Sequence, residues 1–144
     1  MPMLISLDPG GTTGVSIIGY DTDSVYLIST EEVGNGLEGF VHWVSEQDLL
    51  QFSEIVCENF TLRTGVYGAD ISPAYVIGAL EAIVHGKTKV IYQYPYQKKL
   101  CTDERLHKIG VYTKGKKHAN DATRHGIIYL RNKMHLPTLQ TGWQ

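Results

Sequence analysis

The chain has few cysteines, no long apolar run and no lysine or arginine in its first 62 positions. Its 144 residues include two cysteines, Cys57 and Cys101, which cannot form a disulfide framework and are typical of reduced thiols in a cytoplasmic protein. No stretch approaches about 20 apolar residues, so we expect no membrane span. The N-terminal segment MPMLISLDPGG lacks a basic start and a long apolar segment, so we also expect no secretory signal.

The missing basic residues make the charge strongly asymmetric. Residues 1–62 hold ten acidic side chains, whereas residues 63–144 hold all 13 lysines and arginines and only five acidic side chains. The net charge of −2 therefore divides into −10 and +8. Such a run is often only a solvated face, but a concentrated basic segment can also attract a polyanion. With 42% hydrophobic residues, the chain can fill the core of one domain, 1–144, in which the final stretch LPTLQTGWQ is interpreted as a tail.

The order of apolar patterns predicts an α/β fold. Three short strands with tight links come first, and helices then alternate with strands; the expected ranges are strands 4–8, 14–20 and 24–33, helix 36–50, strand 54–60, helix 72–86, strand 89–94, a short helix 102–110 and a last helix at about 118–133. Right-handed crossovers place strands 4–8, 54–60 and 89–94 parallel. We therefore expect a five-stranded mixed sheet, antiparallel in its first three strands, with helices on both faces.

The helix at 72–86 has clear end signals and an unusual surface. Ser72 is the expected N-cap, Pro73 occupies the first turn and Gly86 is the expected C-cap. The helix is apolar on most sides, and it carries a row of small residues at Ala74, Gly78 and Ala82. This row suits either tight packing on the chain's own sheet or close approach of a second copy.

Three acidic residues fall where a sheet edge would bring them together. Asp8 ends the first strand and Glu58 lies near the end of the fourth. If these strands are parallel neighbours, both carboxylates emerge at the edge where open α/β sheets bind ligands. Asp121 lies in the first turn of the last helix, and Gly126 predicts that this helix approaches the sheet closely. Each acid alone is more often a surface or helix-capping residue.

A cluster of carboxylates indicates a cation. Three carboxylates repel one another, and oxygen-rich ligation suits Mg²⁺ or Mn²⁺ better than Zn²⁺. Two ions about 4 Å apart would activate water and stabilise the leaving oxygen of a phosphodiester. His118 could help to hold the second ion or transfer protons. His125, one turn further on, is interpreted as a residue that either packs in the core or supports a metal ligand.

Three segments resemble the catalytic segments of RuvC-like Holliday junction resolvases: LDPGGTTGVSII, VCENF and HANDATRH. The resemblance implies an RNase H-like fold and a Mg²⁺-dependent endonuclease that cuts four-way DNA junctions by paired hydrolysis. It assigns Asp8, Glu58, His118 and Asp121 as catalytic and metal-binding residues, with two ions per site. It also implies a homodimer through helix 72–86 and a short, phage-type member that acts in the cytoplasm. The loop after Glu58 departs from the family pattern.

The expected DNA contacts surround these segments. Basic residues that would hold backbone phosphates are Arg63, Lys98, Lys99, Lys114, Lys116 and Lys117. Arg124, Arg131 and Lys133 would extend this patch along the last helix. Phe60, Leu62 and Tyr67 are candidates for the apolar residue that probes the junction centre. Any one of these cations is more often simply solvated.

Other functions remain open at this level. The segment DPGGTTG alone also resembles the phosphate loop of sugar kinases and other actin-like ATPases, but those need two such domains and a much longer chain. A nuclease of the same fold could act on flapped or branched DNA or on a ribosomal-RNA precursor. A binding module without catalysis is a third possibility, although all the expected ligands are present.

Overall fold

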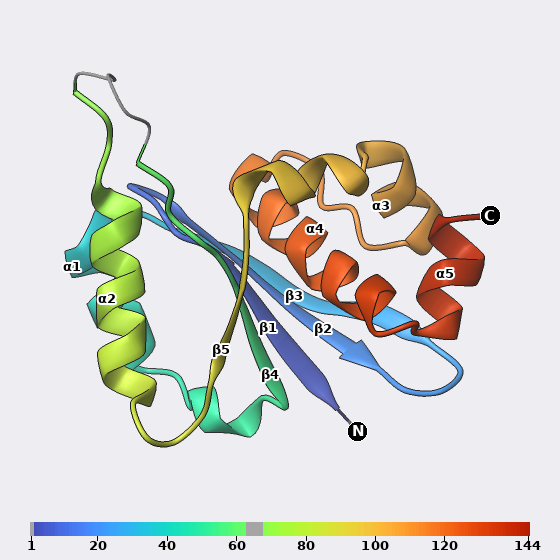
Figure 1. Ribbon diagram of the computed structural model, residues 1–144, viewed down its shortest axis with the longest axis horizontal. Helices are drawn as coiled ribbons and strands as arrows, with labels where there is room; N and C mark the ends of the chain where they lie inside the picture. The colour runs from blue at the N-terminus through green and yellow to red at the C-terminus, as the bar shows by residue number, and fades with distance from the viewer. Residues whose placement is uncertain (1, 63–67) are drawn as a thin grey trace.

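The computed structural model describes residues 2–62 and 68–144, and its centre is a five-stranded mixed sheet (Figure 1). The strands are β1 (Met3–Asp8), β2 (Thr13–Tyr20), β3 (Val25–Val33), β4 (Glu54–Glu58) and β5 (Val90–Gln93). The helices are α1 (Gly36–Ser45), α2 (Ser72–Val84), α3 (Asp103–Ile109), α4 (Lys117–Asn132) and α5 (Leu136–Gly142), with 3-10 turns η1 (Leu49–Gln51) and η2 (Pro95–Leu100).

The strand order is β3-β2-β1-β4-β5, which confirms the expected sheet. β1 is central, because it pairs antiparallel with β2 and parallel with β4, and β4 pairs parallel with β5. In this register Leu7 faces Cys57, so the next residues along each strand, Asp8 and Glu58, come out at the same edge. Asp8 also faces Gly14, which in turn faces Glu32 on β3.

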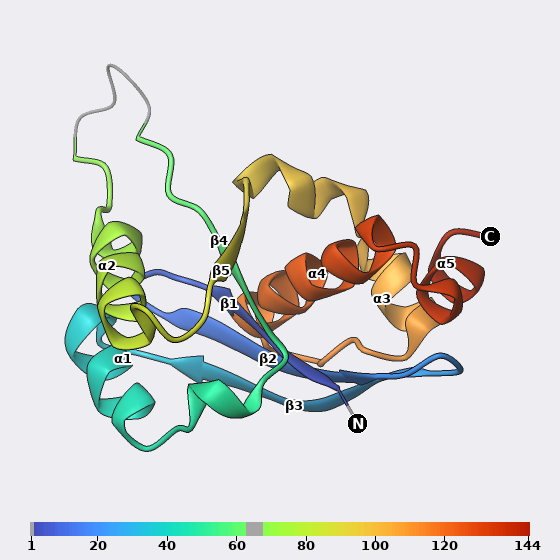
Figure 2. The same ribbon diagram turned by 60° about the horizontal axis from the view of Figure 1, so that its bottom comes forward.

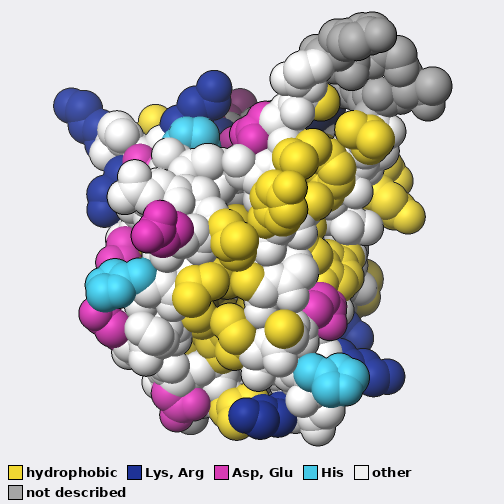
Figure 3. Space-filling model, turned by 90° about the vertical axis from the view of Figure 1, so that its left-hand side faces the viewer, with side chains coloured by type: hydrophobic (Ala, Val, Ile, Leu, Met, Phe, Trp, Pro, Cys, Tyr) yellow, Lys and Arg dark blue, Asp and Glu magenta, His cyan; other side chains and the backbone are white. Residues whose placement is uncertain are grey.

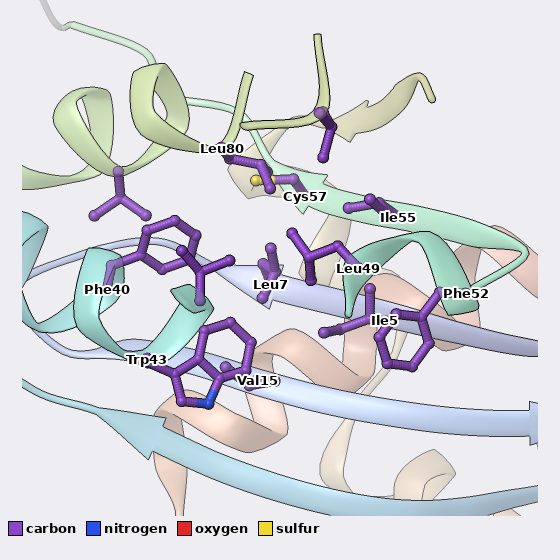
Figure 4. Packing of buried hydrophobic residues seen from close by; sticks show 13 residues of the cluster. Ile5, Leu7, Val15, Phe40, Trp43, Leu49, Phe52, Ile55, Cys57 and Leu80 are labelled. Atoms are coloured by element: carbon purple, nitrogen blue, oxygen red, sulfur yellow. The ribbon is translucent and has the colours of Figure 1, made fainter. Parts of the chain in front are cut away.

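Alternation along β1 separates two layers. Ile5 and Leu7 lie in the apolar cluster beneath α1 and α2, where Phe40 and Leu80 are completely buried (Figure 4). Leu4 belongs to the second cluster, which α3 and α4 cover from the other side of the sheet (Figure 2). Because side chains alternate across a strand, Ser6 and Asp8 face the same side as Leu4, toward α4.

Two glycines let α4 lie close against the sheet. A Cβ added at Gly126 would come 2.6 Å from Ile18 Cδ1, and one added at Gly14 would come 1.9 Å from the His118 carbonyl oxygen. Both distances are far below van der Waals contact, so neither position accepts a side chain without a shift. The close approach predicted from Gly126 is confirmed, and Gly14 fixes the start of α4 next to the end of β1.

Several boundaries differ from the sequence expectation. Ser72 is the first residue of α2 rather than its N-cap, because Asp70 accepts a hydrogen bond from the Ser72 N–H at 2.9 Å and Ile71 is in the cap position. Gly86 lies one residue beyond the C-cap, His85, with φ of +72°. The helix expected at 36–50 ends at Ser45 and is followed by η1, because Asp48 caps this new turn with its side chain.

The end of β4 and the end of the chain also differ from expectation. β4 stops at Glu58, two residues earlier than expected. The stretch interpreted as a tail forms α5, and Trp143 after it lies under the guanidinium groups of Arg105 and Arg131. Among residues 2–62 and 68–144, no helix is long and apolar enough to cross a membrane.

Candidate active site

Three carboxylates meet where β1 and β4 end under the first turns of α4. Asp8 and Glu58 share a hydrogen bond. The ammonium of Lys98 lies 3.1 Å from Glu58 Oε2 and 3.7 Å from Asp121 Oδ2, so it joins the third carboxylate to the other two. We refer to Asp8, Glu58 and Asp121 as the carboxylate cluster. The sheet edge and the helix start thus bring together the three acids that the sequence singles out.

Asp8 is the most perturbed acid of the cluster. Burial raises its pKa to about 8, and the hydrogen bond and negative charge of Glu58 add to the effect. The positive charge of Lys98 acts in the opposite direction but is the weaker influence. At neutral pH the Asp8 carboxyl therefore holds a proton, which it donates to Glu58. This proton, the Lys98 ammonium and the Arg124 guanidinium together reduce the repulsion among the three crowded acids.

Glu58 is held in its charged form by a buried histidine. Burial by itself would raise the pKa of Glu58, but hydrogen bonds from His125 and Asp8, together with Lys98, outweigh it and lower the pKa to about 2. His125 Nε2 lies 2.8 Å from Glu58 Oε2, and its other ring nitrogen lies 2.8 Å from Gln93 Oε1. The His125 side chain is completely buried. The ring therefore fixes both the position and the charge of Glu58.

His125 agrees with its interpretation from the sequence, whereas Gln93 is not expected near the cluster. His125 is buried and contacts a cluster carboxylate directly. Gln93, which sequence reasoning misses, ends β5 next to Glu58 in the sheet register. A glutamine that ends a buried parallel strand beside a strand-ending acid is the signal that could have found it.

Lys98 occupies a different place from the one expected. The sequence places it in a rim that holds DNA phosphates, yet its side chain is only 26% exposed and contacts two acids of the cluster. Burial alone would lower its pKa, but the charges of Asp8, Glu58 and Asp121 prevail and raise it. The turn η2 carries Lys98 back over the strand ends, and no periodic pattern in the sequence reveals that turn.

His118 is the second residue of α4, but its ring stays apart from the cluster. Its backbone N–H donates to Glu32 Oε2 at 2.7 Å, and the Ala119 N–H donates to the same oxygen at 3.2 Å. The imidazole is exposed and forms no hydrogen bond or ion pair within the described part of the chain. Glu32, which sequence reasoning misses, therefore caps α4 from β3 and sets the position of the helix turn that carries Asp121.

The carboxylate cluster fits a hard divalent cation in its chemistry. Three acids supply oxygen donors around the Lys98 ammonium, and the Arg124 guanidinium also pairs with Asp121. Within residues 2–62 and 68–144, no three acidic, histidine or cysteine side chains are already arranged as a metal-binding group. The donors are therefore of the right type, but without an ion Lys98 pairs with two of the acids and Asp8 is protonated.

The remaining expected DNA contacts that the structure describes lie around the start of α4, on η2 and just beyond β4. Lys114 and Lys117 are exposed beside the start of α4, and Lys116 Nζ donates to the Thr30 carbonyl at 3.4 Å. Lys99 is exposed on η2, and Phe60 is half-buried just beyond β4. Arg63 and Tyr67 lie outside the described residues.

The architecture matches known Holliday junction resolvases. A RuvC structure from Thermus thermophilus superposes with a TM-score of 0.64 at 15% identity, over 92% of this chain and 97% of that one. The same protein with a Holliday junction substrate gives 0.64 at 12% identity, over 92% and 96%. The Fowlpox virus resolvase with Holliday junction DNA gives 0.63 at 16% identity, over 90% and 99%. The fold is RNase H-like.

A similar architecture also occurs within a larger protein. The large terminase of a thermophilic bacteriophage matches with a TM-score of 0.50 at 15% identity, over 90% of this chain and 40% of that one. No protein-family model and no curated protein matches the chain. At such low identities the likeness establishes the fold, and the chemistry has to be argued from the carboxylate cluster.

Proposed function

We propose that the protein is a metal-dependent, structure-selective endonuclease that cuts four-way DNA junctions. The observation that carries this proposal is the carboxylate cluster, built at the carboxyl ends of β1 and β4 in a fold shared with two junction resolvases. The whole chain, including α5, would act as one nuclease domain. Its two cysteines are both free and buried, which suits a reducing, cytoplasmic compartment.

The cluster residues would hold the metal. Asp8, Glu58 and Asp121 supply the oxygens, and His118 at the start of α4 would contribute a nitrogen or move a proton. Bound Mg²⁺ or Mn²⁺, as two ions per site, would polarise the scissile phosphodiester and lower the pKa of water. Before that, Asp8 has to lose its proton and Lys98 has to leave the cluster. His125 and Gln93 keep Glu58 fixed throughout.

Lys98 would then change its partner. Once its ammonium leaves Glu58 and Asp121, it would pair with a phosphate of DNA bound at the same edge. This reconciles its observed ion pairs with the expected DNA contact. The other expected contacts, Lys99, Lys114, Lys116, Lys117 and Arg63, would surround the site, while Phe60 or Tyr67 would reach the junction centre.

A homodimer through α2 would place two such sites on one junction. The large apolar residues Ile71, Tyr75 and Ile83 at α2 are exposed to solvent, and the Tyr75 side chain is 55% exposed. The row of small residues on α2 is exposed as well; it consists of Ala74, Gly78 and Ala82. Leu37 and Val41 on α1 are also exposed. Figure 3 shows the resulting band of hydrophobic side chains on the α1/α2 side of the molecule. An exposed apolar band of this kind is typical of a protein interface.

Sedimentation tests the dimer. The wild type should sediment as two copies of the 16.1 kDa chain. Tyr75→Glu should produce monomers, because a charge in the centre of an apolar interface has to be desolvated. Met134→Glu, a matched change at an exposed residue outside α1 and α2, should leave the dimer intact. A wild type that stays monomeric at every concentration would contradict this part of the proposal.

A substrate panel tests the activity. The protein is incubated with a four-way junction, a linear duplex, a flap and a structured RNA, each with Mg²⁺ or with EDTA. Symmetric paired nicks in the junction alone, only with Mg²⁺, are the expected result. Cleavage of RNA or of the flap would favour a nuclease for another substrate. Junction binding without any cleavage would favour a binding module that keeps the fold.

A further inference from the structure

A hollow of about 260 Å³ lies beside the carboxylate cluster, along one side of α4. Its lining includes Lys117, Asn120 and Arg124 of α4, Lys116 just before the helix and Asp103 at the start of α3. Positions 117, 120 and 124 follow helical spacing and so share one face of α4. The next row of the same helix carries Asp121 and His125. The hollow and the cluster are therefore neighbours on one helix.

The hollow carries an excess of positive charge. Three of these residues are cations, whereas Asp103 is the only acid in the lining. Neither Lys116 nor Lys117 forms an ion pair with any described residue, and Lys117 is exposed. Their charge is thus available to an anion that enters from solvent.

Arg124 is the unusual member of this group. Its Nη2 pairs with Asp103, and its Nε lies 3.5 Å from Asp121 Oδ1. The third nitrogen, Nη1, is buried and has no hydrogen-bond partner among the described residues. The side chain is only 16% exposed. A buried guanidinium N–H without an acceptor is costly, and its planar fork suits a phosphate oxygen.

We propose that this hollow binds a backbone phosphate of the DNA strand that enters the candidate active site, with Arg124 as its central ligand. This inference rests on the proposed function and adds a defined phosphate subsite to it. Because Arg124 also contacts Asp121, a phosphate held there is fixed relative to the carboxylate cluster. Asp103 competes with that phosphate for the same guanidinium.

The competition gives variants with opposite effects on junction affinity in EDTA. Arg124→Gln should weaken binding roughly tenfold and make the dependence of log affinity on log salt shallower by about 1, since one charge-assisted phosphate contact is lost. Lys117→Gln should act in the same direction. Asp103→Asn should instead tighten binding, because it releases the guanidinium. Melting curves establish that each variant is folded.

Matched control variants distinguish binding of a phosphate in the hollow from a general effect of net charge on DNA affinity. Glu104→Gln makes the same change in net charge one residue further along α3, but Glu104 pairs with Lys108 and does not line the hollow. Lys87→Gln removes a lysine just after α2, outside the hollow. We expect Asp103→Asn to tighten binding clearly more than Glu104→Gln, and Lys117→Gln to weaken it more than Lys87→Gln.

Two results would overturn the subsite. Equal effects of Asp103→Asn and Glu104→Gln on junction affinity would show only a general effect of net charge. An Arg124→Gln variant that binds the junction like the wild type would show that Arg124 is not the central phosphate ligand. If the wild type cuts junctions in either case, the proposed function stands without the subsite. A wild type that binds no branched DNA would overturn both.

Discussion

On the α1/α2 face of the sheet the buried side chains are almost all apolar, whereas on the α4 face polar groups are buried among apolar ones. Phe40, Val76 and Leu80 are completely buried on the first face. On the second face Ser16 accepts a hydrogen bond from Thr123 at 2.7 Å, and His125 lies between Glu58 and Gln93. Both faces belong to the same five strands, so the difference comes from what each helix layer has to position.

A small fold can thus divide stability and function between the two faces of one sheet. An apolar layer gains stability from burial alone and tolerates replacement by residues of similar volume. A polar layer gains less, because each buried group needs a partner, and the hydroxyl of Ser6 has none among the described residues. The α4 face therefore gives up stability in order to hold the carboxylate cluster in place.

Replacing a cluster acid should have the largest effect. Asp8→Asn and Glu58→Gln should each lower the rate of junction cleavage by roughly 1,000-fold or more, because losing a metal ligand removes about 4 kcal/mol of transition-state stabilisation. Junction affinity in EDTA should stay near the wild-type value, which gel-shift titration measures. Cleavage by either variant at the wild-type rate would show that the cluster is not the active site.

Adjacent glutamates on β3 allow a direct comparison of the two faces. Glu32 caps α4, whereas Glu31 accepts a hydrogen bond from Trp43 Nε1 of α1 at 2.7 Å. Glu32→Ala and Glu31→Ala should each lower the free energy of unfolding by about 1 kcal/mol, measured by urea denaturation. Only Glu32→Ala should also slow cleavage by the folded protein, about tenfold, because Asp121 lies in the first turns of α4. Equal cleavage rates for the two variants would argue against this division.

The smallest expected effect is on how thermal stability depends on pH in the absence of metal. The folded pKa of Asp8, about 8, exceeds its ordinary value of 3.8. Between these values the folded state holds a proton that the unfolded state has released, so Asp8 makes the wild type less stable as pH rises. In EDTA, Asp8→Asn should melt close to wild type at pH 4 and at least about 3 °C higher at pH 8. Asp23→Asn, on an exposed turn, should show no such trend.

The sheet and the cluster acids could be predicted because they depend on local patterns. Alternating apolar residues identify the strands, Gly126 indicates close helix packing, and the register of two parallel strands brings Asp8 to Glu58. The strand order, the helix layers on both faces of the sheet and the position of Asp121 near Asp8 and Glu58 could be predicted from the same patterns. These features are encoded in short stretches of chain, which is the scale on which periodicity works.

The partners of the acids could not be predicted, because they depend on how distant segments turn. Lys98 reaches the cluster through η2, and Glu32 reaches the α4 start from 86 residues away. His125 gains its role only from Gln93 and Glu58 on two separate strands. Ser72 is misplaced for a smaller reason, since Asp70 two residues earlier is also a good capping residue.

The most direct test of the central claim is calorimetric titration of Mg²⁺ into the wild type and into Asp8→Asn, at pH 7 in two buffers with different protonation enthalpies. We predict that Mg²⁺ binds the wild type with release of a proton, because Asp8 has to ionise, and that Asp8→Asn binds far more weakly and releases none. No Mg²⁺ binding by the wild type, or equal binding by the variant, would contradict the assignment of the carboxylate cluster as the metal site.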